Sequence, residues 1–358
     1  MSNHLKPAAG TMRVIFLYVG QGESTLILMP DGSGHKSILV DCNRAPKLGG
    51  IDLPKLLADL PTKRSDGSPR LDLFVNTHPH NDHVCGIGDI HKATYIEELW
   101  QSGHKPSNAH EGPYKDLVDV EKAVKARGGA VEELRGTRDD LAFAEGLINV
   151  VAPAEHVCDD IAGEDAATRD RRIHEHCAVV RIRYGSGDMR GVLLTGDSDK
   201  TAWRDHITEY HGKDGENRIA ASVLSASHHG SRTFFKDTED DEDVYEEHMN
   251  RIKPTYVVIS APDRADSPHD HPHEDAVALY EKHVGAEQVL HMGSRKWSWI
   301  LDVKKDERFE IISDRGDLAR EYGLKDETKE ESDKGSGRGR APVVVVPRVD
   351  QSRRMGRK

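Results

Sequence analysis

The chain has 358 residues, a length that would fit two or three average domains but that one large α/β sandwich can also fill. Hydrophobic residues make up 36% and charged residues 31%, as in a globular protein, and apolar runs such as Val14 to Val19 are far shorter than the roughly 20 residues of a membrane span. Residues 1–12 lack an apolar core flanked by positive charge, so we expect no secretory signal, no membrane partner and a cytoplasmic location.

The first predicted elements form a β-meander. Two aliphatic and β-branched runs, Val14 to Val19 and Thr25 to Met29, are separated by Gly20-Gln21-Gly22, which predicts a strand, a tight loop and a second strand. After a glycine-rich turn, the run Ser37 to Asp41 predicts a third strand that ends on a carboxylate.

The rest of the chain alternates strands and helices. Helical spacing is found at Ile51 to Leu60, Tyr114 to Arg127 and Glu274 to His283. Further strands are predicted at Leu71 to Asn76, Ala130 to Leu134, Leu141 to Phe143, Ile148 to Ala152, Ala178 to Tyr184, Val192 to Thr195, Ala221 to Ala226 and Tyr256 to Ser260. This alternation in two halves predicts an α/β fold, a four-layer αββα sandwich.

The domain organisation follows from composition. We predict an N-terminal leader at residues 1–12, one catalytic domain at 13–313 and a flexible charged tail at 314–358, where apolar residues are scarce before Val343 to Val346. The net charge of −12 would repel a polyanion if it were spread evenly, but the chain is basic from Lys334 onward. We therefore expect the tail to be the arm for a nucleic acid or a protein partner.

The four cysteines are far apart and show no C-x-x-C spacing: Cys42, Cys85, Cys158 and Cys177. This pattern argues against a disulfide framework and against a thiolate zinc site. We expect all four to be ordinary buried thiols.

The strongest chemical signal is the segment His78-Pro-His80-Asn-Asp82-His83, which directly follows an apolar strand. Imidazole nitrogens and carboxylate oxygens are ligands that borderline divalent metals prefer. On an extended loop, His78 and His80 would point toward one ion, and Asp82 and His83 would face a second. A histidine-rich surface loop is the alternative, but further ligand candidates at the ends of later strands favour a metal site.

Three later segments supply those candidates. A predicted strand delivers Asp197 at its end, and one carboxylate can bridge two cations. Another strand runs into His228-His229-Gly230. A third segment, residues 269–273, carries three histidines at alternate positions, which an exposed loop would explain equally well.

Taken together, the motifs resemble those of a known family. They are Phe16-Leu-Tyr-Val-Gly-Gln-Gly-Glu23, Ile38-Leu-Val-Asp41, Thr77-His-Pro-His-Asn-Asp-His-Val84, Leu193-Leu-Thr-Gly-Asp197, Ser227-His-His-Gly-Ser231 and His271-Pro-His273. In order and spacing they are similar to the metallo-β-lactamase domain of ComEC-type DNA-uptake proteins and their stand-alone relatives, over roughly residues 13 to 302. The chain departs from the family at Tyr18 and Glu23, where Asp is usual, and at Cys85, where Gly is usual.

The resemblance implies a site for two divalent ions, Zn²⁺ or Mn²⁺. One ion would be held by His78 and His80, with His174 or His176, and the other by Asp82, His83 and His228, with Asp197 as the bridge. Asp41 would orient a ligand by a hydrogen bond. His229 and His271 would lie near the substrate, so the expected catalytic residues are Asp82, His229 and His271.

The resemblance also suggests a function. Two cations would lower the pKa of a shared water and give a metal-bridged hydroxide, and the ComEC-like motifs favour a phosphodiester substrate such as DNA or RNA. The leading hypothesis is a metal-dependent hydrolase, a phosphodiesterase or nuclease, although the membrane channel of ComEC is absent. Two alternatives are a hydrolase of a small ester, thioester or lactam, because the fold does not fix the substrate, and a metal-stabilised binding or effector module.

Overall fold

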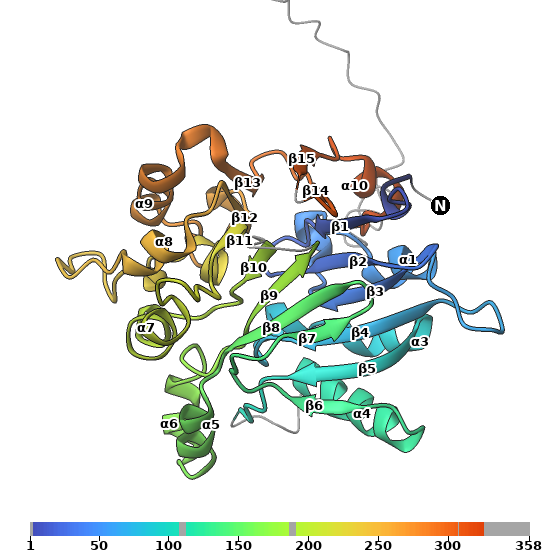
Figure 1. Cartoon of the computed structure of the whole chain (residues 1–358), viewed down its shortest axis with the longest axis horizontal. Coiled ribbons are helices and arrows are strands. Elements are labelled where there is room, and N and C mark those ends of the chain that lie inside the picture. Colours follow the sequence, from blue (N-terminus) through green and yellow to red (C-terminus); the bar gives the residue numbers. More distant parts are fainter. Residues whose placement is uncertain (1–2, 107–111, 186–190, 307, 326–358) are drawn as a thin grey trace, which may run out of the picture. The chain divides into compact units, whose positions relative to one another are not determined.

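The computed structural model describes residues 3–106, 112–185, 191–306 and 308–325, which belong to one compact unit that ends at Lys325. Two β-sheets of this unit lie face to face, and helices cover their outer faces (Figure 1). The predicted four-layer αββα sandwich is therefore confirmed. No helix among the described residues is long and apolar enough to cross a membrane.

The first sheet has eight strands and is covered by four α-helices on its outer face. Its strands, in spatial order, are β15 (Phe309–Ser313), β14 (Trp299–Lys304), β1 (Thr11–Phe16), β2 (Thr25–Asp31), β3 (Gly34–Val40), β4 (Arg70–Asn76), β5 (Tyr95–Gln101) and β6 (Val131–Glu133). Its helices are α1 (Leu53–Ala58), α3 (Ile87–Ala93), α4 (Gly112–Ala126) and α10 (Asp317–Tyr322).

The second sheet has seven strands, and its outer face packs against a second set of helices. Its strands, in spatial order, are β13 (Val289–Gly293), β12 (Tyr256–Pro262), β11 (Ala221–Ser225), β10 (Gly191–Leu194), β9 (Val179–Tyr184), β8 (Gly146–Ala152) and β7 (Leu141–Phe143). Its helices are the π-helical turn η3 (Ala202–Ile207), α7 (Thr208–His211), α8 (Glu247–Ile252) and α9 (Glu274–Val284). Three short helices, α2 (Asn81–Val84), α5 (Glu155–Ala162) and α6 (Ala166–Arg171), belong to the connections.

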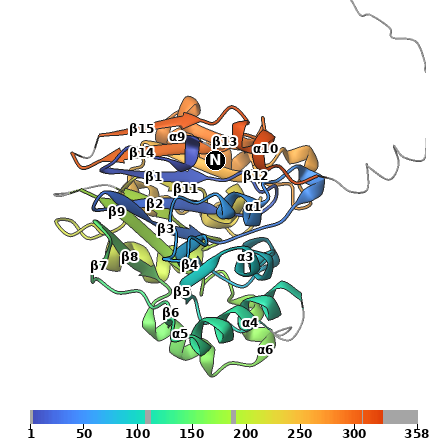
Figure 2. The same cartoon turned by 90° about the vertical axis from the view of Figure 1, so that its right-hand side faces the viewer.

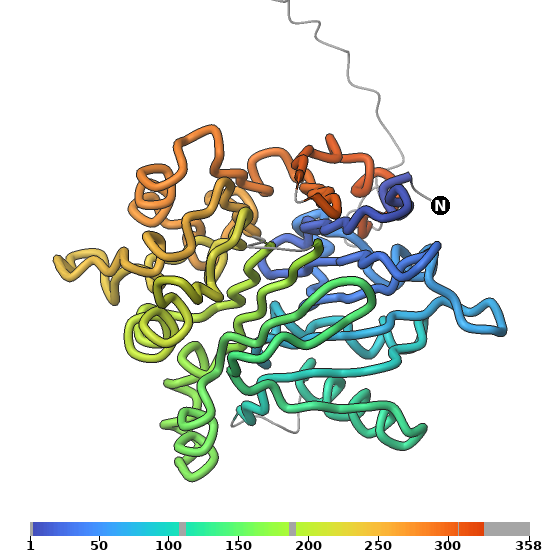
Figure 3. Tube along the Cα trace, viewed as in Figure 1, coloured from blue at the N-terminus to red at the C-terminus, as the bar shows by residue number. Residues whose placement is uncertain are grey.

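The strand sequences explain the layers, because alternate side chains of a strand point to opposite faces of its sheet. In β1, Ile15 faces the helices, whereas Val14 and Phe16 face the second sheet. In β11, Val223 packs between the sheets and Leu224 packs under the outer helices. The central core therefore lies between the two sheets, whose layers can be followed in Figures 2 and 3.

Most predicted elements are present, with small shifts at their ends. The strand predicted at Val14 to Val19 ends at Phe16, since the backbone carbonyl of Tyr18 accepts a hydrogen bond from Ile51 N instead of a sheet partner. Four strands, β5, β13, β14 and β15, have no counterpart among the predicted elements. Charged or polar residues interrupt their apolar runs, so only the neighbouring strands stabilise them as sheet.

The predicted ends of the catalytic domain need correction. Leu5 is buried in the core and β1 begins at Thr11, so much of the expected leader belongs to the sandwich. The buried carboxylate of Asp314 accepts three backbone hydrogen bonds, from Ser298, Gly316 and Leu318.

Helix α10 follows this carboxylate. It buries Leu318 and Tyr322, and the Tyr322 hydroxyl donates to Asp59 at 2.9 Å. The polar composition of this helix gave no sequence signal, because contacts with the segment around α1, such as that of Asp52 N with Tyr322 O at 2.7 Å, and the Asp314 carboxylate stabilise it. The segment 314–325 is therefore part of the domain, and the rest of the expected tail, 326–358, lies outside the described residues.

Candidate metal centre

Several connections meet at one edge of the sandwich. Strands β3 and β4 are parallel, so Asp41 and the segment that begins at His78 follow them at the same edge. Strands β10 and β11 are also parallel, so Asp197 and His228 emerge together. Strand β9 is antiparallel to β10, and the residues just before it, including His174, therefore return to that edge. Side chains that are far apart in the sequence converge there.

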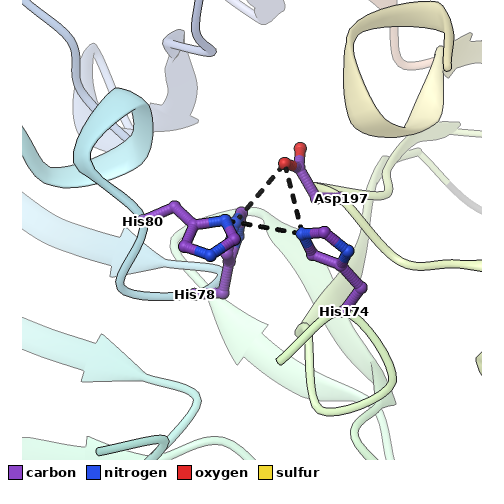
Figure 4. Close-up of side chains that lie close together, drawn as sticks. All are labelled: His78, His80, His174 and Asp197. Carbon is purple, nitrogen blue, oxygen red and sulfur yellow. Dashed lines mark hydrogen bonds and ion pairs between the residues drawn. The ribbon is translucent and has the colours of Figure 1, made fainter. Parts of the chain in front are cut away.

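The first ligand group comprises four side chains: His78, His80, His174 and Asp197 (Figure 4). One nitrogen or oxygen atom from each lies within 4.8 Å of the others. His78 Nε2 is 3.5 Å from Asp197 Oδ2, and His174 Nε2 is 3.4 Å from His80 Nδ1. Three imidazoles and one carboxylate thus point at a common centre.

The second ligand group comprises Asp82, His83 and His229, whose ligand atoms also lie within 4.8 Å of one another. His229 Nε2 is 3.2 Å from Asp82 Oδ2 and 3.2 Å from His83 Nε2. His83 and His229 are fully buried or nearly so. The histidine segment after β4 therefore contributes His78 and His80 to the first group and Asp82 and His83 to the second.

Asp197 lies between the two groups. Its Oδ2 faces the first group and also lies 3.5 Å from His228 Nε2, whereas its Oδ1 is 3.1 Å from His83 Nε2 and 3.6 Å from His229 Nε2. Each oxygen therefore faces a different set of imidazoles. This is the arrangement in which one carboxylate can bridge two cations.

Asp41 orients ligands of both groups from below. Its Oδ2 accepts hydrogen bonds from His83 Nδ1 at 2.8 Å and from Thr77 Oγ1 at 2.6 Å. Thr77 Oγ1 in turn lies 3.2 Å from His78 Nδ1 and can accept its proton. Because Nδ1 carries the proton in both rings, each Nε2 lone pair faces the site.

The donor set fits bound cations. His229 Nδ1 donates to the Ser260 carbonyl at 2.9 Å, so in their neutral forms His83 and His229 present two Nε2 lone pairs to each other. Such lone pairs repel unless a cation or a proton lies between them. Among the described residues, the buried atoms His78 Nε2 and Asp197 Oδ1 also make no hydrogen bond, since their close contacts lack the required geometry.

The electrostatics of the first group favour metal binding as well. Burial holds the pKa of His78 well below its ordinary value and lowers the pKa of His174 to about 4. Burial raises the pKa of Asp197, but the imidazoles around it, His83 foremost, bring it well below its ordinary range. Neutral imidazoles around an ionised carboxylate are the protonation states that a metal needs.

A family comparison agrees with this geometry. The model of the metallo-beta-lactamase superfamily matches residues 17–202, slightly more than half of the chain. The chain belongs to the metallo-beta-lactamase superfamily. It is therefore a member of a superfamily of metal-dependent hydrolases. Six of the seven ligand-group residues lie in the matched region, and only His229 lies beyond it.

No curated protein matches the sequence significantly. Among solved structures, the chain is similar to Igni18, a metallo hydrolase from the archaeon Ignicoccus hospitalis, with 14% identity and a TM-score of 0.41, covering 84% of this chain and 98% of that one. It is also similar to a diphosphatase of the PhnP family, with 14% identity and a TM-score of 0.39, covering 78% of this chain and 94% of that one.

The structure exchanges the expected roles of two neighbouring residues of this metallo-beta-lactamase superfamily member. His228 was expected beside Asp82 and His83, but His229 occupies that place. His228 instead lies against the first group, with its ring centroid 4.4 Å from that of His174. The predicted assignment of His228 to the second group is therefore wrong.

The backbone of the turn after β11 explains this exchange. Both residues adopt left-handed conformations, with φ of 50° for His228 and 58° for His229. Two successive left-handed non-glycine residues cost on the order of 1–3 kcal/mol each and are typical of functional sites. The turn is held by a hydrogen bond from His228 N to Gly196 O at 2.9 Å and directs the two imidazoles to different groups.

The open choice between His174 and His176 is decided by geometry. His174 joins the first ligand group, whereas His176 points away from it, with Nδ1 3.2 Å from His104 Nδ1 and Nε2 3.4 Å from Cys158 Sγ. His176 is thus not placed as a ligand. It anchors the turn that presents His174.

The cysteines only partly match the expectation. All four are free, and Cys42, Cys158 and Cys177 are buried, but Cys85 is half-exposed. Cys177 also has a role in the site: its Sγ accepts a hydrogen bond from Asp197 N at 3.3 Å and lies 3.6 Å from His78 Nδ1. It therefore helps to place two members of the first ligand group.

His271 lies at the rim of the centre. Its side chain is buried, and its ring centroid is 5.1 Å from that of His228 and 6.2 Å from that of His229. It belongs to neither ligand group. Gln21, which was not among the predicted site residues, places its amide nitrogen 3.4 Å from His271 Nδ1.

Two further residues were missed. Thr77 Oγ1 links the Asp41 carboxylate to His78 Nδ1 through two hydrogen bonds. The only sequence signal for Thr77 was its position immediately before the histidine segment. Glu23 forms a third acidic and imidazole group with Asp41 and His83 and accepts a hydrogen bond from Ser225 Oγ. Burial, foremost, raises the pKa of Glu23 to about 7. Its signal was its place at the end of the Val-Gly-Gln-Gly loop.

Proposed function

We propose that the protein is a metal-dependent phosphodiester hydrolase, a phosphodiesterase or nuclease. The observation that carries the proposal is the placement of Asp197, whose two oxygens face two different ligand groups. Bound divalent cations supply an activated water molecule at neutral pH and neutralise oxygens of the group under attack. The nitrogen and oxygen ligands suit Zn²⁺ or Mn²⁺.

The imidazoles outside the ligand groups support a phosphodiester as the substrate. His228 is 3.5 Å from Asp197 Oδ2, and His271 lies beside His228, yet neither belongs to a ligand group. A phosphodiester has two non-bridging oxygens and a leaving oxygen, whereas a lactam or ester carbonyl has one oxygen that gains charge. An imidazole N–H at the rim, such as that of His271, can donate to these oxygens and therefore suits a phosphoryl group.

We also propose that the protein belongs to the ComEC-like branch of the superfamily. The Val-Gly-Gln-Gly loop and the His-His-Gly-Ser turn, which are typical of that branch, lie at the same rim and are linked through His271. This placement gives both motifs a role in one site, which supports the proposal.

A substrate panel tests the proposed function. Zinc- and manganese-loaded protein would be assayed with a chromogenic phosphodiester, single- and double-stranded DNA, RNA and cyclic dinucleotides, beside an ester, a thioester and a lactam. We expect turnover of at least one phosphodiester that chelation abolishes and metal addition restores. Turnover of only the ester, thioester or lactam would contradict the proposal, and binding without any turnover would indicate an effector module.

The proposed nucleic-acid partner involves the basic stretch from Lys334, which lies outside the described residues. Deleting residues 334–358 should weaken binding to DNA or RNA and flatten its salt dependence, because counterion release scales with the basic groups engaged. Hydrolysis of a small phosphodiester should not change. An unchanged salt slope in the truncated protein would show that this stretch does not bind the polyanion.

A further inference from the structure

Gln21 reaches the rim of the metal centre from the loop between β1 and β2. Its side chain is 8% exposed, and the loop backbone is held by Asn43, whose Nδ2 donates to Val19 O at 3.2 Å and to Gln21 O. Gly22, with φ of 134°, passes so close to the backbone of Asp82 that a Cβ atom would lie 2.5 Å from its carbonyl oxygen. The loop therefore holds Gln21 in a defined place.

Ser267 fixes the orientation of the Gln21 amide. Its Oγ accepts hydrogen bonds from His269 N at 3.3 Å and from His271 N at 3.0 Å. A hydroxyl has two lone pairs and one hydrogen, so its hydrogen remains to be donated. The acceptor is Gln21 Oε1, at 3.1 Å. The amide oxygen of Gln21 must then face Ser267.

The amide nitrogen of Gln21 consequently faces His271. It lies 3.4 Å from His271 Nδ1, and an amide nitrogen can only donate. His271 Nδ1 must therefore accept, and the single proton of the neutral ring is placed on Nε2. An imidazolium would set an N–H of His271 against the N–H of Gln21, so the same contact also disfavours the charged ring.

This is the opposite of the arrangement at the ligand histidines. The Nδ1 atoms of His83 and His229 face acceptors, the Asp41 carboxylate and the Ser260 carbonyl, which leaves a lone pair on Nε2 for a metal. At His271 the partner of Nδ1 is a donor, which leaves a proton on Nε2 instead. Among these three histidines, the partner at Nδ1 thus sets which nitrogen carries the proton.

We infer that Gln21 is a positioning residue that holds His271 in the Nε2–H tautomer, so that His271 is an N–H donor and not a metal ligand. This donor lies beside His228 at the edge of the two ligand groups. If the proposed function holds, on which this last step rests, it donates to a phosphoryl oxygen of the bound substrate or to the leaving oxygen.

Gln21→Glu tests the inference, because a carboxylate of the same shape accepts where the amide donates. Histidine tautomers would be read from side-chain nitrogen and carbon chemical shifts of the zinc-loaded full chain, with the His271 signals identified by their loss in His271→Gln. We expect the proton on Nε2 in the wild type and on Nδ1 in Gln21→Glu. Gln288→Glu, which makes the same change of charge elsewhere, should leave His271 unchanged.

Ser267→Ala is a second variant, since it removes the group that orients the amide, and should give a mixture of both tautomers. With a small phosphodiester, Gln21→Glu should lower kcat by about 10²-fold, the usual contribution of a positioned proton donor, with unchanged metal content and little change in KM. A wild-type His271 with its proton on Nδ1, or a tautomer that Gln21→Glu does not change, would overturn the inference. If no phosphodiester is cleaved but the tautomer changes, the proposed function fails and the role of Gln21 stands.

Discussion

The metal centre and the aromatic cluster of Phe234, Phe235, Tyr245 and His248 both bury imidazoles, but only the metal centre brings them together with a carboxylate. His248 of α8 is fully buried among aromatic rings, with its centroid 4.0 Å from that of Phe234 and 5.0 Å from that of Tyr245. Neither of its ring nitrogens makes a hydrogen bond of ordinary geometry to the described residues. Burial lowers its pKa to about 3.

His83 and His229 are buried almost as deeply, yet their Nδ1 atoms are held by hydrogen bonds. His83 Nδ1 contacts Asp41 and His229 Nδ1 contacts the Ser260 carbonyl, and both Nε2 atoms converge with a carboxylate. Burial of a histidine is therefore not what marks a site. A metal site is marked by an acceptor that holds each Nδ1 and by Nε2 atoms that converge on one centre.

The largest expected effect is on hydrolysis and comes from a change at the metal centre. Asp197→Asn keeps the shape of the side chain but removes the charge shared by both ligand groups, so hydrolysis should fall by at least about 10³-fold. Bound metal should fall too, while the circular dichroism spectrum stays that of the wild type. Asp214→Asn, at a 95% exposed side chain, is the control. Wild-type rates in Asp197→Asn would remove Asp197 from the site.

The next effect tests the exchanged histidines. His229→Ala removes a member of the second ligand group and should weaken binding of one metal by more than about 100-fold, beyond what loss of an orienting residue costs. His228→Ala should keep both metals and react slowly, because His228 is not needed to complete either group. Metal titration of the two purified variants measures this. The reverse pattern would restore the assignment made from the sequence.

A smaller effect is expected beneath the ligands. Four donors converge on the Asp41 carboxylate: Asn76 Nδ2, Thr77 N, Thr77 Oγ1 and His83 Nδ1. Asp41→Asn must point its amide hydrogens at some of these donors, so metal affinity should fall by about 10- to 100-fold. Asp52→Asn is a matched control, because asparagine can replace aspartate as the N-cap of α1. Equal metal affinities in both variants would contradict this role of Asp41.

The smallest expected effect concerns the free energy of unfolding and lies in the aromatic cluster around His248. The pKa of His248 is about 3 in the folded protein against an ordinary 6.5, so folding opposes its protonation. The contribution of neutral His248 to the free energy of unfolding is complete above pH 6.5 and is lost as the pH falls toward 3. Each pH unit in this window costs about 1.4 kcal/mol, or about 2 kcal/mol between pH 6.5 and pH 5.

His248→Phe removes this titration and fits an aromatic environment. We expect the variant to lose about 2 kcal/mol less free energy of unfolding than the wild type between pH 6.5 and pH 5, measured by urea denaturation of the metal-free proteins. The exposed His269→Phe is the control. Parallel pH profiles for wild type and His248→Phe would show that His248 is not held neutral by burial.

Local patterns predicted much of the fold, but not its ends. The continuous apolar runs of β1 to β4 and the glycine-rich loop were visible because they depend on nearest neighbours in the chain. Helix α10, the edge strand β15 and its neighbour β14 were not, since contacts to distant segments stabilise them. The Tyr322 hydroxyl, for instance, needs Asp59.

For the site, the sequence by itself determined which chemistry is present. The segment His78 to His83 carries ligands of both groups within six residues, and Asp197 follows an apolar strand, so a metal centre could be expected without any structure. Such clusters are local, and their residue types restrict the metals that suit them.

Only the tertiary structure decided which neighbour does what. His228 and His229 are adjacent, and His174 and His176 are separated by one residue, so nothing in the local pattern ranks them. The left-handed turn after β11 places His229 beside Asp82. His176 instead contacts His104 and Cys158 and points away from the first group. The direction in which a side chain points depends on backbone dihedral angles and on partners from distant strands. Neither can be read from the local order of residues.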